Sequence, residues 1–196
     1  VCCSGSMAML LYPELLDLQK SYSDLQVNIE AAPNTKSIEL IKQNKSDVAL
    51  ITSQIADPEL MVKEVGAEKL FLVLPKGLSS TWADLMELGY INHPNGAHYA
   101  TQVFEQNYKG EFTGFKDIPQ AGYVNQLNQI LLPVAQQLGF TVLPESTITT
   151  YPDQHLIKTP SLESACSETI YMVTKKYKTL PRRYEQIIKI LERLWV

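Results

Sequence analysis

The chain alternates short apolar runs with longer segments whose apolar residues recur every three or four positions, a pattern typical of alternating strands and helices. The pattern of the first fifty residues predicts a strand over Val1–Ser4, a helix over Ser6–Tyr22, a strand over Leu25–Ala31, a helix over Thr35–Asn44 and a strand over Asp47–Thr52. Such an order favours parallel strands joined by right-handed crossovers, with helices on both faces of the sheet.

Two more extended segments, Met61–Val65 and Leu70–Leu74, end at a break that begins with Pro75. A second alternation then predicts a helix over Trp82–Leu88, a strand over Tyr90–Asn92, a helix over Ala97–Tyr108, a strand over Phe115–Ile118, a helix over Asn125–Leu138, a strand over Phe140–Leu143, a strand over Thr169–Thr174 and a helix over Leu180–Trp195 capped by Thr179. We therefore expect an α/β fold of two Rossmann-like subdomains, residues 1–74 plus 162–196 and residues 75–161, with a hinge and a central cleft.

Ligands of open α/β sheets bind beyond the carboxyl ends of the strands, so the loops after the predicted strands hold the candidate binding residues. These candidates are mostly hydroxyl and amide side chains: Ser4, Ser6, Thr35, Thr52 and Ser53 in the first half, and His93, Asn95 and Val124 in the second. Two of the first-half loops also open a helix, whose free N–H groups favour anions. The competing interpretation is that Ser4, Ser6 and Thr35 only cap helices and that His93 is a solvated or structurally bonded loop residue.

The charges of the chain bear on both its partners and its ligand. Lys plus Arg number 17 and Asp plus Glu 21, for a net charge of −4. The broad basic face of a nucleic-acid reader is missing, so this segment alone should not bind DNA. The three arginines all fall on the last predicted helix, and Lys36 is the one fixed charge near the candidate loops. We therefore expect a small polar effector, a carboxylate held by neutral donors.

Several other classes are excluded or disfavoured by the sequence. No apolar stretch approaches the roughly 18 residues of a membrane-spanning helix, and no signal peptide is visible, while the start at Val1 within a predicted strand suggests a piece of a longer protein. Cys2, Cys3 and Cys166 fit buried thiols of a reducing cytoplasm better than a disulfide scaffold. Neither nucleotide-binding nor nucleophile motifs occur, and His93 and His98 lack a third metal ligand. We expect no enzyme, no metal and no cofactor.

Five stretches, taken in order, carry a family resemblance. They are S-G-S-M-A-M-L-L-Y-P-E-L-L-D-L-Q-K-S-Y at the start, then D-V-A-L-I-T, L-F-L-V-L-P, Q-Q-L-G-F-T-V-L-P-E-S and the terminal L-P-R-R-Y-E-Q-I-I-K-I-L-E-R-L. Over essentially the whole chain they resemble the effector-binding domain of LysR-type transcriptional regulators. The resemblance implies a fold similar to type 2 periplasmic binding proteins, a small-molecule effector in the cleft, and DNA contact only through an N-terminal winged helix-turn-helix that this chain lacks.

The resemblance also implies site residues and an assembly. The family's effector contacts correspond here to Ser4, Ser6, Thr35, Thr52, His93, Asn95 and Val124. Side-by-side homodimers or tetramers are implied, and we expect an antiparallel dimer in which the helix Ser6–Tyr22 of one chain meets Asn125–Leu138 of another. Peroxide-sensing members pair cysteines in the second subdomain, and the lack of any cysteine between Cys3 and Cys166 disfavours redox sensing.

The function implied is that of a cytoplasmic ligand-sensing domain that controls transcription, with no membrane partner. An extracytoplasmic solute-binding receptor of the same fold is the alternative, and an enzyme on this fold is a third possibility. The sequence upstream of Val1 would separate the first two, since a helix-turn-helix supports the regulator and an apolar leader supports the receptor.

Overall fold

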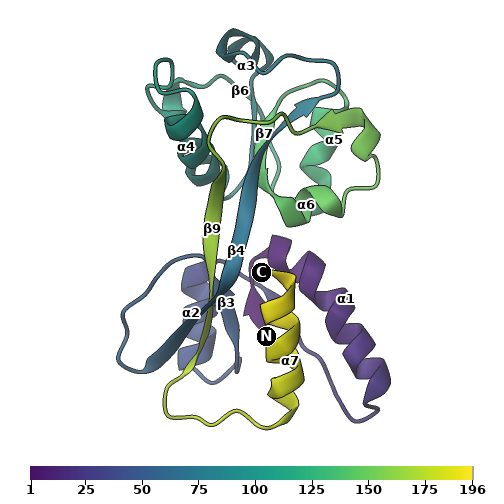
Figure 1. The fold of residues 1–196 in the computed structure, drawn as a ribbon, viewed down its shortest axis with the longest axis vertical. Coiled ribbons are helices and arrows are strands. Elements are labelled where there is room, and N and C mark those ends of the chain that lie inside the picture. Colours follow the sequence, from purple (N-terminus) through teal and green to yellow (C-terminus); the bar gives the residue numbers. More distant parts are fainter. Residues whose placement is uncertain (196) are drawn as a thin grey trace. The chain divides into compact units, whose positions relative to one another are not determined.

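The computed structural model describes residues 1–195 and divides the chain into two compact units (Figure 1). Unit 1 consists of Val1–Glu68 and Glu168–Val196, and unit 2 of Lys69–Ser167. The chain changes unit inside two long strands, β4 (Leu60–Pro75) and β9 (Cys166–Lys175), whereas the sequence placed the changes at Pro75 and residue 162. Because both strands stay extended through the change, no turn residues mark it in the sequence.

Unit 1 is a sheet flanked by helices. Its elements besides β4 and β9 are β1 (Cys2–Cys3), α1 (Gly5–Ser21), β2 (Glu30–Ala31), α2 (Asn34–Lys42), β3 (Ala49–Ile51) and α7 (Arg183–Leu194). The strands follow the order β2-β1-β3-β9-β4, with β1 parallel to β2 and β3 and with β9 antiparallel to β3. The predicted alternation of parallel strands and helices at the start of the chain is thus confirmed.

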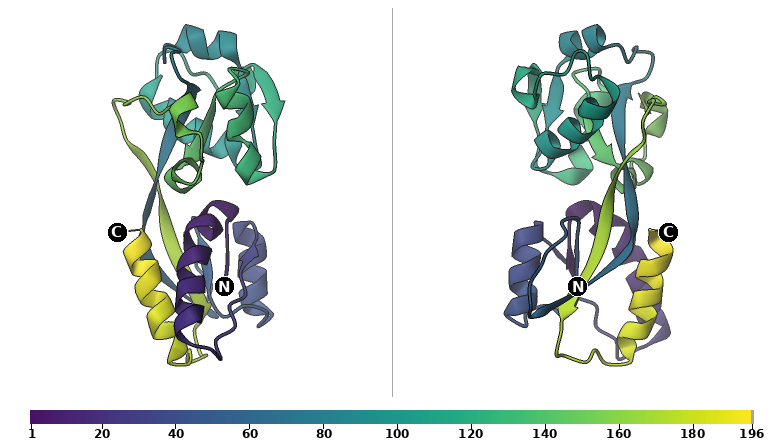
Figure 2. Two further views of the ribbon diagram at one scale, coloured as in Figure 1. Left: turned by 90° about the vertical axis from the view of Figure 1, so that its right-hand side faces the viewer. Right: turned by 60° about the vertical axis from the view of Figure 1, so that its left-hand side comes forward.

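Adjacent residues of β1 and β3 are all buried but belong to two different cores, one on each face of the sheet. Cys3 packs on one face in the cluster that contains residues of α1 and α7, and its neighbour Cys2 packs on the other face against α2. Figure 2 shows α1 and α7 on one side of these strands and α2 on the other. Adjacent strand residues point to opposite faces, so these two thiols cannot meet. They and Cys166 are free and buried, as the sequence predicts, and burial raises the pKa of Cys3 to about 12.

Unit 2 is built around β5 and the segment of β4 that enters it. Its elements are α3 (Trp82–Leu88), β5 (Tyr90–Asn92), α4 (Gly96–Asn107), a 3₁₀ helix (Phe115–Asp117), β6 (Gln120–Tyr123), a 3₁₀ helix (Leu127–Gln129), α5 (Leu131–Ala135), β7 (Thr141–Pro144), α6 (Glu145–Thr149), a 3₁₀ helix (Gln154–Leu156) and β8 (Ile157–Lys158). β5 runs parallel to β6, and β4 runs antiparallel to β7 and β8. The helix Trp82–Leu88 and the strand Tyr90–Asn92 have the predicted bounds.

The strand predicted over Phe115–Ile118 is wrong. Phe115 begins a 3₁₀ helix, and its ring packs edge-on against Tyr90 at 5.3 Å between ring centres, so its apolar character serves core packing. The strand of this region is β6, whose residues are all exposed. An exposed strand has no alternation of apolar and polar positions, and the sequence therefore gave no signal for it.

The predicted helix over Asn125–Leu138 is also too long. Its apolar stripe is real, since Ile130, Leu131 and Val134 are buried together, but the α-helical part is only Leu131–Ala135. Pro133, which has no N–H to give, lies in the first turn of α5, where none is needed. Gln137 then adopts a left-handed backbone with φ of 63°, which ends the helix.

Two further predictions are wrong in their bounds. Within Leu25–Ala31 only β2 pairs as a strand. The last helix begins at Arg183, so Thr179 is not its cap, and no side chain caps this helix. Among residues 1–195, no helix is both long and apolar enough to cross a membrane.

Candidate functional site

The carboxyl ends of β1, β2 and β3 meet at one edge of unit 1. Cys3 pairs with Ala31 and Cys2 with Ala49, all in parallel, so the segments after the three strands leave the sheet on the same side. β1 lies between the other two strands. The loop after β1 is therefore flanked by the loops after β2 and β3, as the sequence analysis required.

Ser4 and Ser6 occupy the central loop of this edge. Ser4 is the N-cap of α1, and its Oγ accepts a hydrogen bond from the backbone N–H of Met7 at 3.3 Å. The two serine Oγ atoms lie 2.9 Å apart in a hydrogen bond. Ser6 is buried and Ser4 half-buried. The capping interpretation of Ser4 is thus confirmed, and a cap with a second lone pair and its own proton can still contact a ligand.

Asn34, which sequence reasoning did not select, joins the two outer loops. Its Nδ2 donates to Thr52 Oγ1 at 3.1 Å and to Ser53 Oγ at 2.9 Å, and its Oδ1 accepts from the Thr52 backbone N–H at 3.3 Å. One amide after β2 therefore holds both predicted hydroxyls after β3. The signal in the sequence was an asparagine directly after a predicted strand, but its importance depends on strand order.

The neighbouring residues of α2 add little charge to this edge. Thr35 is exposed within the first turn of α2 and is not its cap, because Pro33 occupies that position and offers no side-chain hydrogen bond. Lys36 pairs with Glu39 at 3.1 Å, and both side chains are at least half exposed. The charge of Lys36 is thus partly neutralised within its own helix.

His93 follows β5 in unit 2 and is only 5% exposed. Its Nε2 lies 3.0 Å from the carbonyl oxygen of Val142, so this nitrogen carries the proton and donates, and its ring lies beside Tyr99. Burial lowers the pKa of His93 and keeps the ring neutral near pH 7. The side chain connects β5 to β7, which is the structural role that the sequence analysis had weighed against effector binding.

Asn95 and Val124 lie at the same edge of unit 2. Asn95 is exposed before α4 and donates from Nδ2 to the Tyr99 hydroxyl at 3.2 Å. Val124 follows β6 directly, and its backbone N–H donates to the Asn92 carbonyl at 2.9 Å. Since β5 and β6 are parallel, their carboxyl ends coincide.

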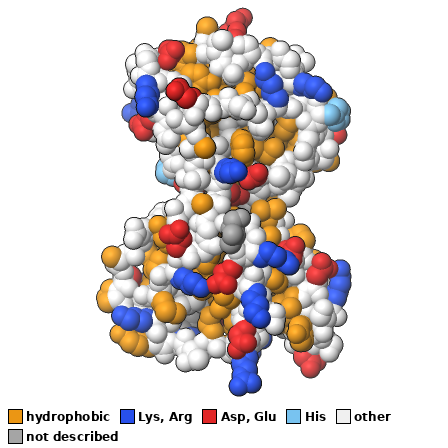
Figure 3. All heavy atoms as spheres, viewed as in Figure 1, with side chains coloured by type: hydrophobic (Ala, Val, Ile, Leu, Met, Phe, Trp, Pro, Cys, Tyr) orange, Lys and Arg blue, Asp and Glu red, His pale blue; other side chains and the backbone are white. Residues whose placement is uncertain are grey.

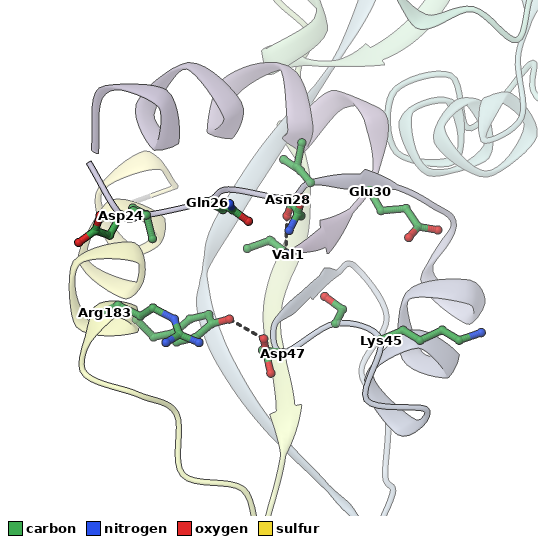
Figure 4. Close-up of a pocket in the computed structure, with 12 residues that line it drawn as sticks. Val1, Asp24, Gln26, Asn28, Glu30, Lys45, Asp47 and Arg183 are labelled. Atoms are coloured by element: carbon green, nitrogen blue, oxygen red, sulfur yellow. Dashed lines mark hydrogen bonds between the residues drawn. The ribbon is translucent and has the colours of Figure 1, made fainter. Parts of the chain in front are cut away.

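A pocket of about 600 Å³ lies elsewhere in unit 1 (Figure 4). It is lined by Val1, Glu30 and Asp47, which stand at the amino ends of β1, β2 and β3, and by Arg183 of α7. Asp47 accepts hydrogen bonds from the Tyr184 hydroxyl and from Lys178, each at 2.6 Å, and these bonds lower its pKa. The pocket therefore lies at the edge opposite to the hydroxyl loops, and its Asp47 carboxylate is already paired with Lys178.

Metal and nucleic-acid chemistry find no support in the described residues. Across residues 1–195, no group of three or more His, Cys, Asp or Glu side chains is placed to hold a metal ion. On the face drawn in Figure 3, the Lys and Arg side chains are interspersed with Asp and Glu and form no continuous basic area.

The family model described as the LysR substrate binding domain matches residues 1–195. The chain belongs to this family. It is therefore a ligand-sensing regulatory domain of the LysR type, and the solute-receptor alternative is not favoured.

Two curated relatives are regulators of transcription by name. The HTH-type transcriptional regulator EstR of Acinetobacter baylyi is 24% identical over 96% of this chain and 64% of that protein. An uncharacterized HTH-type transcriptional regulator of Staphylococcus xylosus is 20% identical over 91% of this chain and 62% of that protein. The LysR-type domain thus spans slightly less than two thirds of either relative.

Solved structures confirm the fold. A mutant of the OxyR2 regulatory domain of Vibrio vulnificus superposes with a TM-score of 0.75 at 14% identity, covering 98% of this chain and 93% of that one. HinK, a LysR family transcriptional regulator of Pseudomonas aeruginosa, superposes with a TM-score of 0.74 at 16% identity, covering 98% of this chain and 68% of that one. The family has the two-subdomain architecture similar to periplasmic binding proteins that the sequence predicted.

Proposed function

We propose that this domain senses a small polar effector, a carboxylate, at the carboxyl edge of β1, β2 and β3. The observation that carries the proposal is the convergence of four hydroxyls there, those of Ser4, Ser6, Thr52 and Ser53. Within residues 1–195, no acidic side chain is hydrogen-bonded to any of them. A carboxylate is bound well by neutral donors. Asn95 and Val124 are kept as proposed effector contacts of unit 2.

The effector signal would control transcription through a DNA-binding segment outside this chain. The support is the family membership together with the helix-turn-helix named in both relatives. We propose that such a protein works in the cytoplasm, without catalysis, as a homodimer or tetramer. The exposed Tyr12 and Leu16 of α1 and the exposed Leu132 and Leu138 offer apolar surface for this assembly.

Thermal unfolding of the domain with a metabolite panel tests the effector site. A ligand at 100 times its dissociation constant adds about 2.7 kcal/mol of stability. For a chain of this size, each kcal/mol shifts the melting temperature by about 2–4 °C. We expect a carboxylate to raise the melting temperature of the wild type by several degrees.

Two variants locate that effect. Thr52→Val removes a hydroxyl at equal volume and Ser4→Ala removes the central one, and each should weaken carboxylate binding by about tenfold, as expected for losing one hydrogen bond to a charged group. Arg183→Gln in the 600 Å³ pocket is the control and should change nothing. A carboxylate that stabilises Thr52→Val and Ser4→Ala fully, but not Arg183→Gln, would move the site to that pocket.

A further inference from the structure

The donor and acceptor roles of two hydroxyls are fixed by Asn34. Its Nδ2 lies 3.1 Å from Thr52 Oγ1 and 2.9 Å from Ser53 Oγ. An amide nitrogen only donates, so both hydroxyl oxygens must accept from it. The protons of Thr52 and Ser53 are then left to point away from Asn34.

The orientation of the Asn34 amide is itself determined. The Thr52 backbone N–H, which only donates, lies 3.3 Å from Asn34 Oδ1. Exchanging the oxygen and nitrogen of the amide would bring two donors together at this contact and would remove the donor from both hydroxyls. The backbone N–H of Thr52 therefore fixes the orientation of the Asn34 amide. The amide in turn makes the hydroxyl oxygens of Thr52 and Ser53 acceptors toward Asn34.

The serine pair adds a third available proton. Ser4 Oγ accepts from Met7 N–H, and it shares one hydrogen bond with Ser6 Oγ. Whichever serine donates in that bond, the proton of the other remains available. The edge between β2 and β3 thus carries three hydroxyl donors.

We infer that Asn34 is a positioning residue that holds the hydroxyls of Thr52 and Ser53 as donors, so that the site selects a carboxylate over an ammonium of the same carbon skeleton. This inference rests on the effector site proposed above. A carboxylate offers only acceptors, so it can accept hydrogen bonds from the three hydroxyl donors. An ammonium offers only donors, so it could use only the one lone pair left on each hydroxyl oxygen and would leave the hydroxyl protons without an acceptor.

The first test needs no ligand and reads the amide directly. In ¹⁵N-labelled protein, Thr52→Val should change the chemical shift of one Asn34 Nδ2 proton and Ser53→Ala that of the other, with the signals assigned by their loss in Asn34→Asp. If either substitution leaves both protons unchanged, the orientation is wrong and the inference fails.

The second test inverts the polarity of the site. In Asn34→Asp the carboxylate accepts from both hydroxyls and turns their protons inward, so the site loses two donors and gains a negative charge. An aspartate at the start of α2 also suits the helix dipole, so the fold should survive, which far-ultraviolet circular dichroism checks. Asn44→Asp is the matched control, because it adds the same charge just beyond the other end of α2.

The probes are matched acid and amine pairs, benzoate with benzylamine and propionate with propylamine, measured by calorimetry. We expect the wild type to prefer the acids. Asn34→Asp should weaken them by about a hundredfold, two charge-assisted bonds at about tenfold each. The preference should then move toward the amines, while Asn44→Asp stays within about twofold of the wild type, since exposed charges at that distance are screened.

The outcomes separate the two proposals. If Thr52→Val weakens the acids and Asn34→Asp does not, the role of Asn34 is refuted and the effector site stands. If the wild type prefers amines or binds neither series, selection for carboxylates is refuted, and the wider metabolite panel then decides the effector site alone. If the acids bind but Thr52→Val and Ser4→Ala leave them unaffected, both proposals fail.

Discussion

Replacing Gly66 by alanine should detach the end of the chain from unit 1. Gly66 lies within β4 with φ of +154°, and an added Cβ would overlap the backbone carbonyl oxygen of Trp195 and lie 2.8 Å from its Cβ. That carbonyl accepts the N–H of Ala67 at 3.1 Å, and the Trp195 ring packs in the same core as Leu191 and Ile187 of α7. The absence of a side chain at Gly66 is therefore what allows the last turn of the chain to dock.

The cost of this substitution has two components. A non-glycine residue at this φ costs about 1–3 kcal/mol of backbone strain. Overpacking against the backbone adds about 1–3 kcal/mol. The chain can avoid the overlap by releasing Trp195, and losing a buried aromatic costs about 3–5 kcal/mol, which limits the total. We expect a loss of about 2–5 kcal/mol for Gly66→Ala.

Two other glycines separate these components. Gly77 has φ of +93° and no atom within 4 Å of an added Cβ, so Gly77→Ala measures backbone strain without overlap. Gly110 has open space as well, and no left-handed φ is recorded for it, so Gly110→Ala should be neutral or slightly stabilising. The expected order of destabilisation is Gly66→Ala, then Gly77→Ala, then Gly110→Ala.

Urea unfolding followed by tryptophan fluorescence measures this order. The chain has two tryptophans, Trp195 in unit 1 and Trp82 in unit 2, so a Trp82→Phe background makes Trp195 the sole reporter. In that background Gly66→Ala should shift the Trp195 emission to longer wavelength before any urea is added. A Gly66→Ala protein whose emission and midpoint match those of Gly77→Ala would refute the reasoning.

Three further outcomes follow from other contacts. Hydrogen bonds from Lys178 and Tyr184 lower the pKa of Asp47, so this carboxylate stabilises the fold fully above its unfolded pKa of about 3.9 and loses that effect as the pH falls through its lower folded pKa. After discounting for its partial exposure, Asp47→Asn should cost about 1 kcal/mol at pH 7 and progressively less below about pH 3.9 in urea titrations. The three buried thiols, with the pKa of Cys3 raised to about 12, should react with a disulfide reagent only slowly in the native state and together in urea, and rapid native labelling would contradict their burial. In sedimentation equilibrium Leu16→Glu should dissociate the proposed dimer, whereas Tyr177→Glu, at a side chain 85% exposed, should not; a dimer that survives Leu16→Glu would exclude α1 from the interface.

The sequence was most informative where burial follows a regular period. In β1 and β3 of unit 1, adjacent residues pack in two different cores, so these strands are short apolar runs that the sequence identifies. The helix Trp82–Leu88 begins after Thr81, whose side chain caps it. The sequence was least informative where apolar and polar residues do not recur at the spacing of the element that forms. β6 is exposed along its whole length, and Pro133 and the left-handed Gln137 shorten a helix whose apolar stripe continues past them.

The sequence predicted which residues lie at the candidate site, but it did not predict the hydrogen bonds that join them. Ser4, Thr52 and Ser53 could be chosen because each lies at or directly after the end of a predicted strand, and parallel strands place such residues at one edge. Asn34 acquires its importance from β1 lying between β2 and β3, which lets one amide reach from the loop of one outer strand to that of the other. Neither the strand order nor the direction of an amide can be obtained from residue spacing.

The effector site proposed at this edge would favour an anion without an unpaired cation. Lys36 is paired with Glu39, and the arginines lie on or directly before α7, so no guanidinium belongs to the hydroxyl loops. The preference must then come from oriented dipoles, and a hydroxyl has an orientation only if a neighbour fixes it. Asn34 supplies that neighbour for Thr52 and Ser53, whereas the Met7 N–H occupies one lone pair of Ser4 Oγ and leaves its proton to Ser6 or to a ligand. A site of this kind would leave no fixed charge without a partner when the effector leaves, which suits a sensor that must release its ligand as well as bind it.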